Sequence, residues 1–274
     1  MAGRDVAVGA CAWRLACVFA ACVASAALCA LPFDADAEIR STERRSGFDF
    51  MSPQTQAMQS DDSSNPGMFW VLDGERLWQE PAGKAGKSCA SCHGEAAGSM
   101  RGVAARYPEF DQSSRRPIDL SGAISVCREK RQSAPPLARE SDELLALTTF
   151  VAHQSRGMPV RPANDPHLKT FLDNGRRWFE RPLGQLQLSC ASCHETRGGM
   201  RLGGSVIPQA HPTGYPLYRL EWQSLGSLQR RLRGCLAGVR AEPFDYGAVE
   251  YVELELFLMW RAAGLAMETP AVRP

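Results

Sequence analysis

The chain repeats one of its own segments at an interval of 101 residues. Gly74–His93 and Gly175–His194 align without a gap, and ten of their 20 positions are identical. Both segments end in the pentapeptide Cys-Ala-Ser-Cys-His. Because an internal repeat sets the architecture of a chain, the sequence predicts two domains of similar fold, each built around one copy of this motif.

Helical patterns surround each copy of the motif. A short helical pattern precedes it in both halves, and apolar residues recur at helical spacing downstream, over Glu140–His153 and over Ala248–Ala263. The strand signal is weak along the whole chain. We therefore expect a mainly α fold, with two tandem domains of about 100 residues each.

The segments between these patterns set the predicted boundaries. Residues 157–168 contain three prolines and cannot form a regular helix, so we expect them to link a first domain, 67–156, to a second domain, 169–274. Residues 38–66 are polar and lack an apolar periodicity, which predicts an extended or partly ordered N-terminal arm.

Residues 1–37 have the pattern of an export signal. Two arginines precede an uncharged apolar run, Leu15–Leu31, and an A-x-A site with small residues at Ala35 and Ala37 follows it. This order is typical of a cleaved secretory signal peptide, so we expect a periplasmic mature protein outside the membrane. A membrane anchor is the alternative, although the run is at the short limit for a span. Cleavage as a lipoprotein before Cys22 would leave few apolar residues ahead of the site.

The ten cysteines have different predicted roles according to position. Four lie in the predicted signal, and six remain in the mature chain: Cys89, Cys92, Cys127, Cys190, Cys193 and Cys235. Four of these six form two C-x-x-C-H motifs, whose thiols are spaced to attach haem covalently. The next residue, His93 or His194, then supplies the proximal iron ligand. A zinc knuckle or a thioredoxin-type motif would need sequence contexts that this chain lacks. We therefore predict two covalently bound haem c groups.

The second axial ligand decides what each haem can do. No methionine occupies the usual place before the last helix of either half, where Cys127 and Cys235 lie instead. A thiolate lowers the iron potential strongly relative to methionine. The alternatives are a disulfide between these two cysteines, two buried free thiols, or a histidine ligand. Three histidines are the rivals: His153, His167 and His211.

Charge is balanced except around the last cysteine. The formal net charge is +1 and no basic run occurs, which gives no case for a nucleic-acid partner. Residues 219–240 nevertheless contain five arginines and one acid. If residues 222–236 are helical, Arg231 and Cys235 lie one turn apart on one face. There the guanidinium could hold a small divalent oxyanion bidentately. A solvated basic face or haem-propionate contacts are the alternative for the neighbouring arginines.

These features resemble the SoxA family, the dihaem subunit of the SoxAX cytochrome of periplasmic thiosulfate oxidation. The resemblance covers about Gly67–Gly264 and rests on both motifs, the downstream cysteine of each half, and Arg231–Cys235. It implies two tandem cytochrome c-like haem domains after the signal peptide, with Cys235, as thiolate or persulfide, as the catalytic group and Arg231 as the substrate contact. It also implies a His/Cys axial pair at each haem: His93 with Cys127, and His194 with Cys235.

The resemblance further implies the activity of an L-cysteine S-thiosulfotransferase. Thiosulfate would be joined oxidatively to a cysteine of a separate SoxYZ-like carrier. Electrons would leave through the second haem to a SoxX-like monohaem subunit, which completes a heterodimer, and then to a soluble cytochrome c. We expect the first haem to be structural or an ancestral duplicate, because its domain lacks the arginine cluster. A plain dihaem electron carrier and a thiosulfate-to-tetrathionate oxidising cytochrome are the alternative functions.

Overall fold

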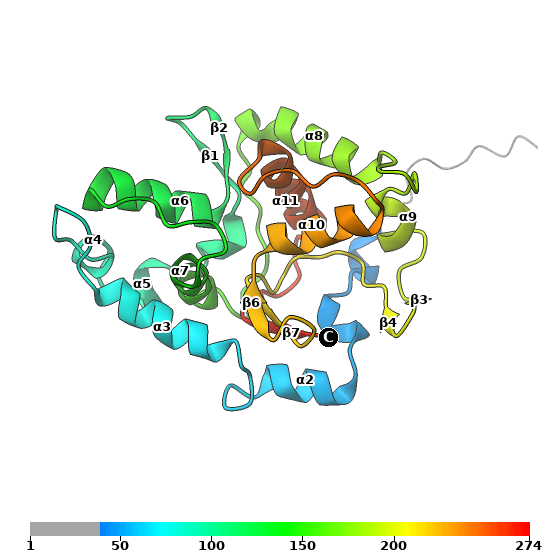
Figure 1. Cartoon of the computed structure of the whole chain (residues 1–274), viewed down its shortest axis with the longest axis horizontal. Helices are drawn as coiled ribbons and strands as arrows, with labels where there is room; N and C mark the ends of the chain where they lie inside the picture. The colour runs from blue at the N-terminus through cyan, green and yellow to red at the C-terminus, as the bar shows by residue number, and fades with distance from the viewer. Residues whose placement is uncertain (1–38) are drawn as a thin grey trace, which may run out of the picture. The chain divides into compact units, whose positions relative to one another are not determined.

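The computed structural model describes residues 39–274 and has the mainly α fold that the sequence predicts (Figure 1). The predicted signal peptide lies outside the described residues. None of the helices within residues 39–274 is long and apolar enough to cross a membrane.

Four long helices and several short ones form most of the regular secondary structure of residues 39–274. The long helices are α3 (Met68–Gln79), α7 (Asp142–His153), α8 (Lys169–Glu180) and α11 (Val249–Arg261). The short helices are α2 (Pro53–Ser60), α4 (Ala90–His93), α5 (Ala96–Ser99), α6 (Leu120–Cys127), α9 (Cys190–His194) and α10 (Leu228–Gly238). The four long helices confirm the helical patterns on either side of each Cys-Ala-Ser-Cys-His motif.

Short strands, which the sequence did not predict, complete the fold. They form two hairpins and one three-stranded sheet of order β6-β5-β7, in which β5 runs antiparallel to β6 and parallel to β7. The strands are β1 (Glu109–Asp111), β2 (Arg116–Ile118), β3 (Arg201–Leu202), β4 (Ser205–Val206), β5 (Leu217–Arg219), β6 (Ser224–Gly226) and β7 (Ala271–Arg273). Strands of two or three residues are too short to show an alternating pattern.

The repeat extends beyond the two motifs. Tyr107–Cys127 and Tyr215–Cys235 correspond at a constant interval of 108 residues, and each contains a hairpin followed by a capped helix that carries a cysteine. The hairpins are β1–β2 and β5–β6, and the helices are α6 and α10. Both halves therefore have one common order: long helix, motif, hairpin, cysteine helix, long helix.

Glycines allow the long helices of each half to cross closely. A Cβ built on Gly74 of α3 would lie 2.2 Å from the Ala146 carbonyl oxygen of α7. A Cβ on Gly175 of α8 would lie 2.0 Å from the Glu253 carbonyl oxygen of α11. Both distances are well inside van der Waals contact, so only glycine permits this backbone approach. These glycines are the first residues of the two repeated segments.

Each half has its own apolar core, and a third core joins the halves. Trp78 and Phe150 belong to the first core, while Phe179 and Phe257 belong to the second. The third core includes Val160, from the segment predicted as a linker. The backbone of that segment pairs with the chain after α11, through the bonds Gly157 N–H to Met267 and Val160 N–H to Leu265. The connection between the halves is therefore part of the core.

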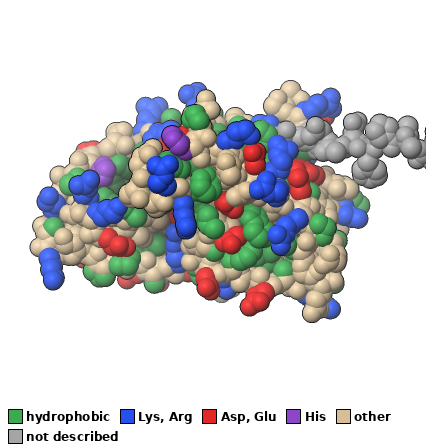
Figure 2. Space-filling view, turned by 90° about the horizontal axis from the view of Figure 1, so that it is seen from above, with side chains coloured by type: hydrophobic (Ala, Val, Ile, Leu, Met, Phe, Trp, Pro, Cys, Tyr) green, Lys and Arg blue, Asp and Glu red, His purple; other side chains and the backbone are tan. Residues whose placement is uncertain are grey.

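Charged groups of both signs are interspersed on the face shown in Figure 2, with hydrophobic side chains between them. This distribution agrees with the formal net charge of +1. The face shown has no continuous basic surface of the kind that nucleic-acid-binding proteins present.

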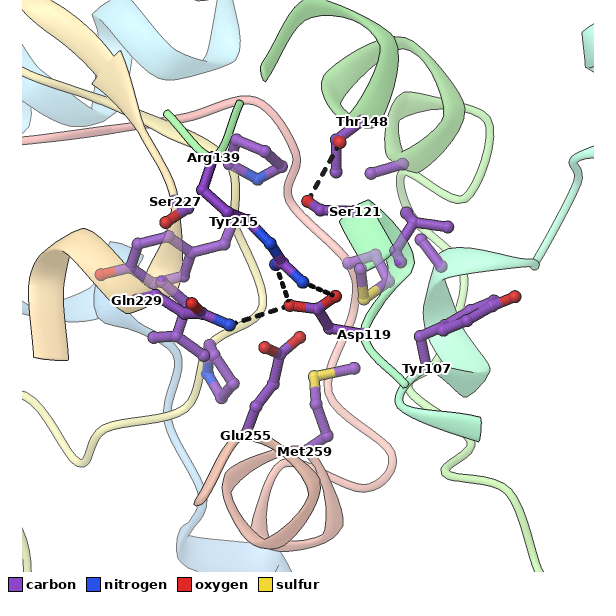
Figure 3. A pocket seen from close by; sticks show the side chains of 17 residues that line it. Tyr107, Asp119, Ser121, Arg139, Thr148, Tyr215, Ser227, Gln229, Glu255 and Met259 are labelled. Carbon is purple, nitrogen blue, oxygen red and sulfur yellow. Dashed lines mark hydrogen bonds and ion pairs between the residues drawn. The ribbon is translucent and has the colours of Figure 1, made fainter. Parts of the chain in front are cut away.

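A buried polar cluster crosses the boundary between the halves (Figure 3). Asp119 caps α6 by accepting a hydrogen bond from the Gly122 N–H at 2.7 Å. Arg139 donates two hydrogen bonds to the same carboxylate, at 2.5 and 3.1 Å, and Gln229 of the second half donates a third at 2.9 Å. Glu255 lies beside them on α11, where burial and then the charge of Asp119 raise its pKa to about 8.

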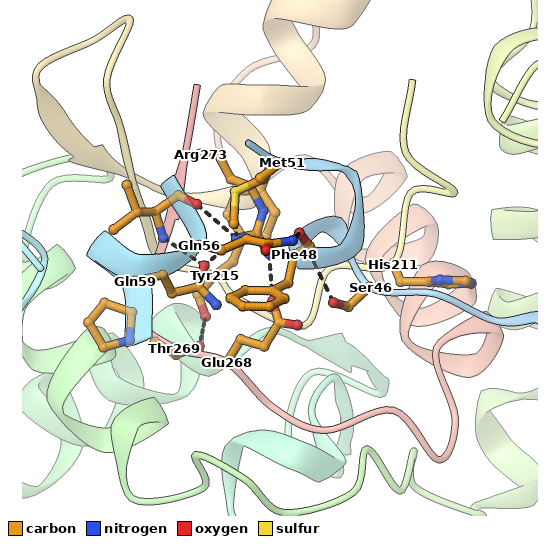
Figure 4. Close-up of polar contacts among 12 residues, drawn as sticks. Ser46, Phe48, Met51, Gln56, Gln59, His211, Tyr215, Glu268, Thr269 and Arg273 are labelled. Atoms are coloured by element: carbon orange, nitrogen blue, oxygen red, sulfur yellow. Dashed lines mark hydrogen bonds and ion pairs between the residues drawn. The ribbon is translucent and has the colours of Figure 1, made fainter. Parts of the chain in front are cut away.

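Residues 39–66, which the sequence predicts to be an extended or partly ordered arm, contain helix α2 and contact the C-terminal end of the chain. Helix α2 begins after Ser52, whose hydroxyl accepts from the Thr55 N–H. Buried polar side chains then bind the C-terminal end of the chain. The Gln59 side chain (Figure 4) accepts from the Val272 N–H at 3.0 Å. Asn65 donates to the Pro270 carbonyl at 2.9 Å. Because hydrogen bonds from polar side chains attach this segment to the rest of the fold, its sequence shows no apolar periodicity.

Candidate haem and substrate sites

The six cysteines of the described chain are free thiols, gathered by half. Burial and then the charge of Cys127 raise the pKa of Cys89, and burial and then the charge of Cys235 raise the pKa of Cys190 to about 12. Each downstream cysteine therefore lies near the motif of its own half. The structure contains no disulfide between Cys127 and Cys235, which was one alternative from the sequence.

In the first half, α4 presents the motif at the surface. Ser88 and Ser91 bind each other and position the turn, and Cys92 and His93 are exposed. The His93 ring packs against Trp78 at a centroid distance of 5.7 Å, and the Trp78 indole donates to the Gly94 carbonyl. The imidazole thus rests on a fixed indole ring while remaining open on its outer side.

In the second half, α9 holds the motif through a capping box between Ser189 and Ser192. The Nδ1 atom of His194 lies 2.6 Å from the Pro208 carbonyl oxygen. Because a carbonyl can only accept, Nδ1 carries the proton and the Nε2 lone pair is free for a metal. Burial, the largest influence, lowers the pKa of His194 and keeps the ring neutral. No sequence pattern predicts this contact with Pro208.

This set of donors fits covalently bound haem. Each half provides two free thiols and a histidine on one helical turn, with a third thiol from α6 or α10 nearby. Two of the three rival histidines have other contacts. His167 stacks on Phe110 at 4.9 Å, and His211 is buried with its Nδ1 2.8 Å from the Arg45 carbonyl. His153 ends α7, and burial lowers its pKa; within residues 39–274 its buried Nε2 atom has no hydrogen-bond partner.

Arg231 and Cys235 lie one turn apart in α10, as the sequence predicts. The helix starts only at Leu228, because Ser224–Gly226 forms β6 and Ser227 caps the helix. Both side chains are half-buried. Burial by itself would lower the pKa of Arg231, whereas nearby negative charge, first that of Cys235, raises it. The raising effects together exceed the effect of burial, so the pKa of Arg231 lies above its ordinary value. Within residues 39–274 the Arg231 guanidinium has no hydrogen bond or ion pair.

The neighbouring arginines have protein partners. Arg230 donates to the Ser224 hydroxyl and the Leu225 carbonyl, and its guanidinium lies 4.3 Å from the centroid of the Trp222 ring. Arg233 donates to the Phe244 carbonyl. The guanidinium groups of these two arginines therefore bind β6 and the chain that follows α10. Arg231 is therefore the arginine of α10 that is available for a ligand.

Comparison with known proteins assigns the family. The SoxA/TsdA cytochrome c domain matches residues 73–160. The L-cysteine S-thiosulfotransferase subunit SoxA of Pseudaminobacter salicylatoxidans is 38% identical over 84% of this chain and 81% of its own length. The SoxA subunit of Rhodovulum sulfidophilum is 37% identical over 85% and 82%. The crystal structure of SoxXA from P. pantotrophus matches with a TM-score of 0.81 and 31% identity, over 84% of this chain and 87% of that chain. The chain therefore belongs to the SoxA family, the cytochromes named as L-cysteine S-thiosulfotransferase subunits.

Proposed function

We propose that this protein is a periplasmic dihaem cytochrome that joins thiosulfate oxidatively to a cysteine of a SoxYZ-like carrier protein. One observation carries the proposal: within residues 39–274 the Arg231 guanidinium makes no hydrogen bond or ion pair, and it lies one turn before Cys235. The equivalent position in the first half, four residues before Cys127, is Ala123. The repeat thus pairs a cysteine with a free arginine in the second half alone.

The donor sets support one haem c in each half. Cys89 and Cys92 would attach the first haem, with His93 and Cys127 on its iron. The second would be attached through Cys190 and Cys193, with His194 and Cys235 on its iron. When bound, haem supplies a one-electron acceptor with a potential lowered by the thiolate ligand.

The reaction balances as thiosulfate plus a carrier thiol giving a carrier S-thiosulfonate, one proton and two electrons. Arg231 would bind the sulfonate oxygens and offset their charge as water leaves. Cys235, as thiolate or persulfide, would form a sulfur–sulfur bond to the sulfane sulfur and lose two electrons in doing so. The carrier thiolate would then attack that sulfane sulfur, form the new bond and release the Cys235 sulfur in its original state.

The partners and the location follow the same proposal. The matched crystal structure is titled SoxXA, which supports a SoxX-like monohaem subunit as the partner in a heterodimer and as the next electron acceptor. A soluble cytochrome c would take the electrons onward. Residues 1–37 would be the cleaved signal peptide, and the two domains would span 67–156 and 169–274. The first haem would be structural or an ancestral duplicate, because Ala123 stands at the position equivalent to Arg231.

The test compares the two downstream cysteines. Cys235→Ala should abolish thiosulfate-dependent modification of the carrier thiol, while a pyridine haemochrome assay and intact mass still give two haems per chain. Cys127→Ala is the matched control and should retain most of the activity. Full activity of Cys235→Ala would refute the catalytic assignment. Turnover without any carrier thiol would instead favour tetrathionate formation.

A further inference from the structure

The two halves carry opposite charges at equivalent positions of their hairpins. At the interval of 108 residues, Asp111 at the end of β1 corresponds to Arg219 at the end of β5. On the helix that follows, Ala123 corresponds to Arg231. At these two equivalent positions the first half therefore has an acid and an alanine, whereas the second half has two arginines.

Arg219 is held in place by its own hairpin. Its side chain is 14% exposed, and its guanidinium lies 5.2 Å from the centroid of the Trp222 ring. Trp222 also packs under Arg230 of α10, so the ring joins the hairpin to the helix that carries Cys235. The remaining contact is a hydrogen bond of 2.9 Å to Glu221, whose side chain is 65% exposed. The Arg219 Nε atom is buried without a hydrogen-bond partner.

The Arg219 and Arg231 side chains are both half-buried, and the exposed carboxylate of Glu221 offsets part of the charge of each. Burial and then the charge of Arg231 lower the pKa of Arg219, so the two cations are close enough to repel each other. Tyr215 feels the charges of both arginines and of Cys235, and its pKa is raised chiefly by burial, which keeps its hydroxyl protonated. In Figure 3 that hydroxyl points away from Asp119. Partly buried like charges are costly unless an anion offsets them.

We propose that Arg219 and Tyr215 complete, with Arg231, a binding site for a dianion whose sulfonate end they hold beside Cys235. The inference rests on the proposed function and names the residues that select its substrate. Two arginines and a phenol would provide donors for the three oxygens of a sulfonate, and the sulfane sulfur would then be directed at Cys235, one turn along α10 from Arg231. A double negative charge suits two guanidinium groups, so the site should prefer dianions over monoanions.

The test uses the haem-loaded protein with its partner subunit and carrier. Arg219→Gln should raise the KM for thiosulfate about tenfold or more, since it removes charge-assisted hydrogen bonds, and should change kcat less than about threefold. Sulfate, a dianion that cannot transfer sulfur, should lose inhibitory affinity by a similar factor, whereas nitrate inhibition should change little. Tyr215→Phe should raise KM about threefold. Arg116→Gln, on the equivalent hairpin of the first half, is the control and should match the wild type.

The outcomes separate this inference from the proposed function. Unchanged KM and sulfate inhibition in both Arg219→Gln and Tyr215→Phe would overturn it, as would an equal loss for sulfate and nitrate. If Arg219→Gln loses haem, Arg219→Lys replaces it in the test, because lysine keeps the positive charge. This variant is expected to raise KM about threefold. A wild-type KM in both Arg219→Lys and Tyr215→Phe would refute the proposed site. The proposed function is decided independently, by whether Cys235→Ala is inactive.

Discussion

Asp119 should be the residue whose charge contributes most to holding the two halves together. Its side chain is 6% exposed, caps α6, and accepts from Arg139 of its own half and Gln229 of the other. Asp119→Asn keeps the shape and the capping oxygen but removes the charge. Removing one partner of a buried ion pair costs about 3–5 kcal/mol. Because the Arg139 side chain is 27% exposed, we expect the lower end, about 3 kcal/mol.

The measurement is thermal unfolding of the haem-loaded protein followed by far-ultraviolet circular dichroism. A loss of this size should lower Tm by about 6–12 °C in a chain of this length. Asp119→Asn/Glu255→Gln should lose more than the two single variants together, because Glu255 is the nearby acid able to replace Asp119 as the partner of Arg139. A decrease of less than about 2 °C in Asp119→Asn would show that water screens the pair and would refute the reasoning.

Two further predictions concern the same packing. The pKa of Glu255 is raised to about 8 in the folded protein, mainly by burial, so its contribution to stability is complete below its ordinary pKa of about 4.3 and is lost as pH rises through 8. Glu255→Gln should flatten this decline in Tm measured from pH 4 to 9, and an unchanged slope would contradict the assignment. Gly74→Ala and Gly175→Ala should each reduce the free energy of unfolding in urea by about 1–3 kcal/mol, through overpacking against a carbonyl. Gly98→Ala, where a built Cβ meets nothing within 4 Å, is the control and should not destabilise the fold; equal effects at all three glycines would exclude helix contact as the cause.

The sequence predicted the parts of the site that depend on local spacing. Two thiols and a histidine within five residues, and an arginine four residues before a cysteine, are brought together by one helical turn. The four long helices were predictable because each buries an apolar face. Polar packing could not be predicted from the sequence. Gln59 and Asn65 bind backbone groups more than 200 residues away, and no local pattern marks such a partner.

What the sequence determined by itself is the donor set: the repeated motif, the downstream cysteines Cys127 and Cys235, and the excess of arginine around the second of them. The tertiary structure decided which arginines are free. It directs Arg230 and Arg233 to protein oxygens, and it places Arg219, from a separate strand, on the Trp222 ring that also packs against Arg230. The physical reason is that covalent and helical spacing is local, whereas the pairing of a buried charge depends on every element that folds against it.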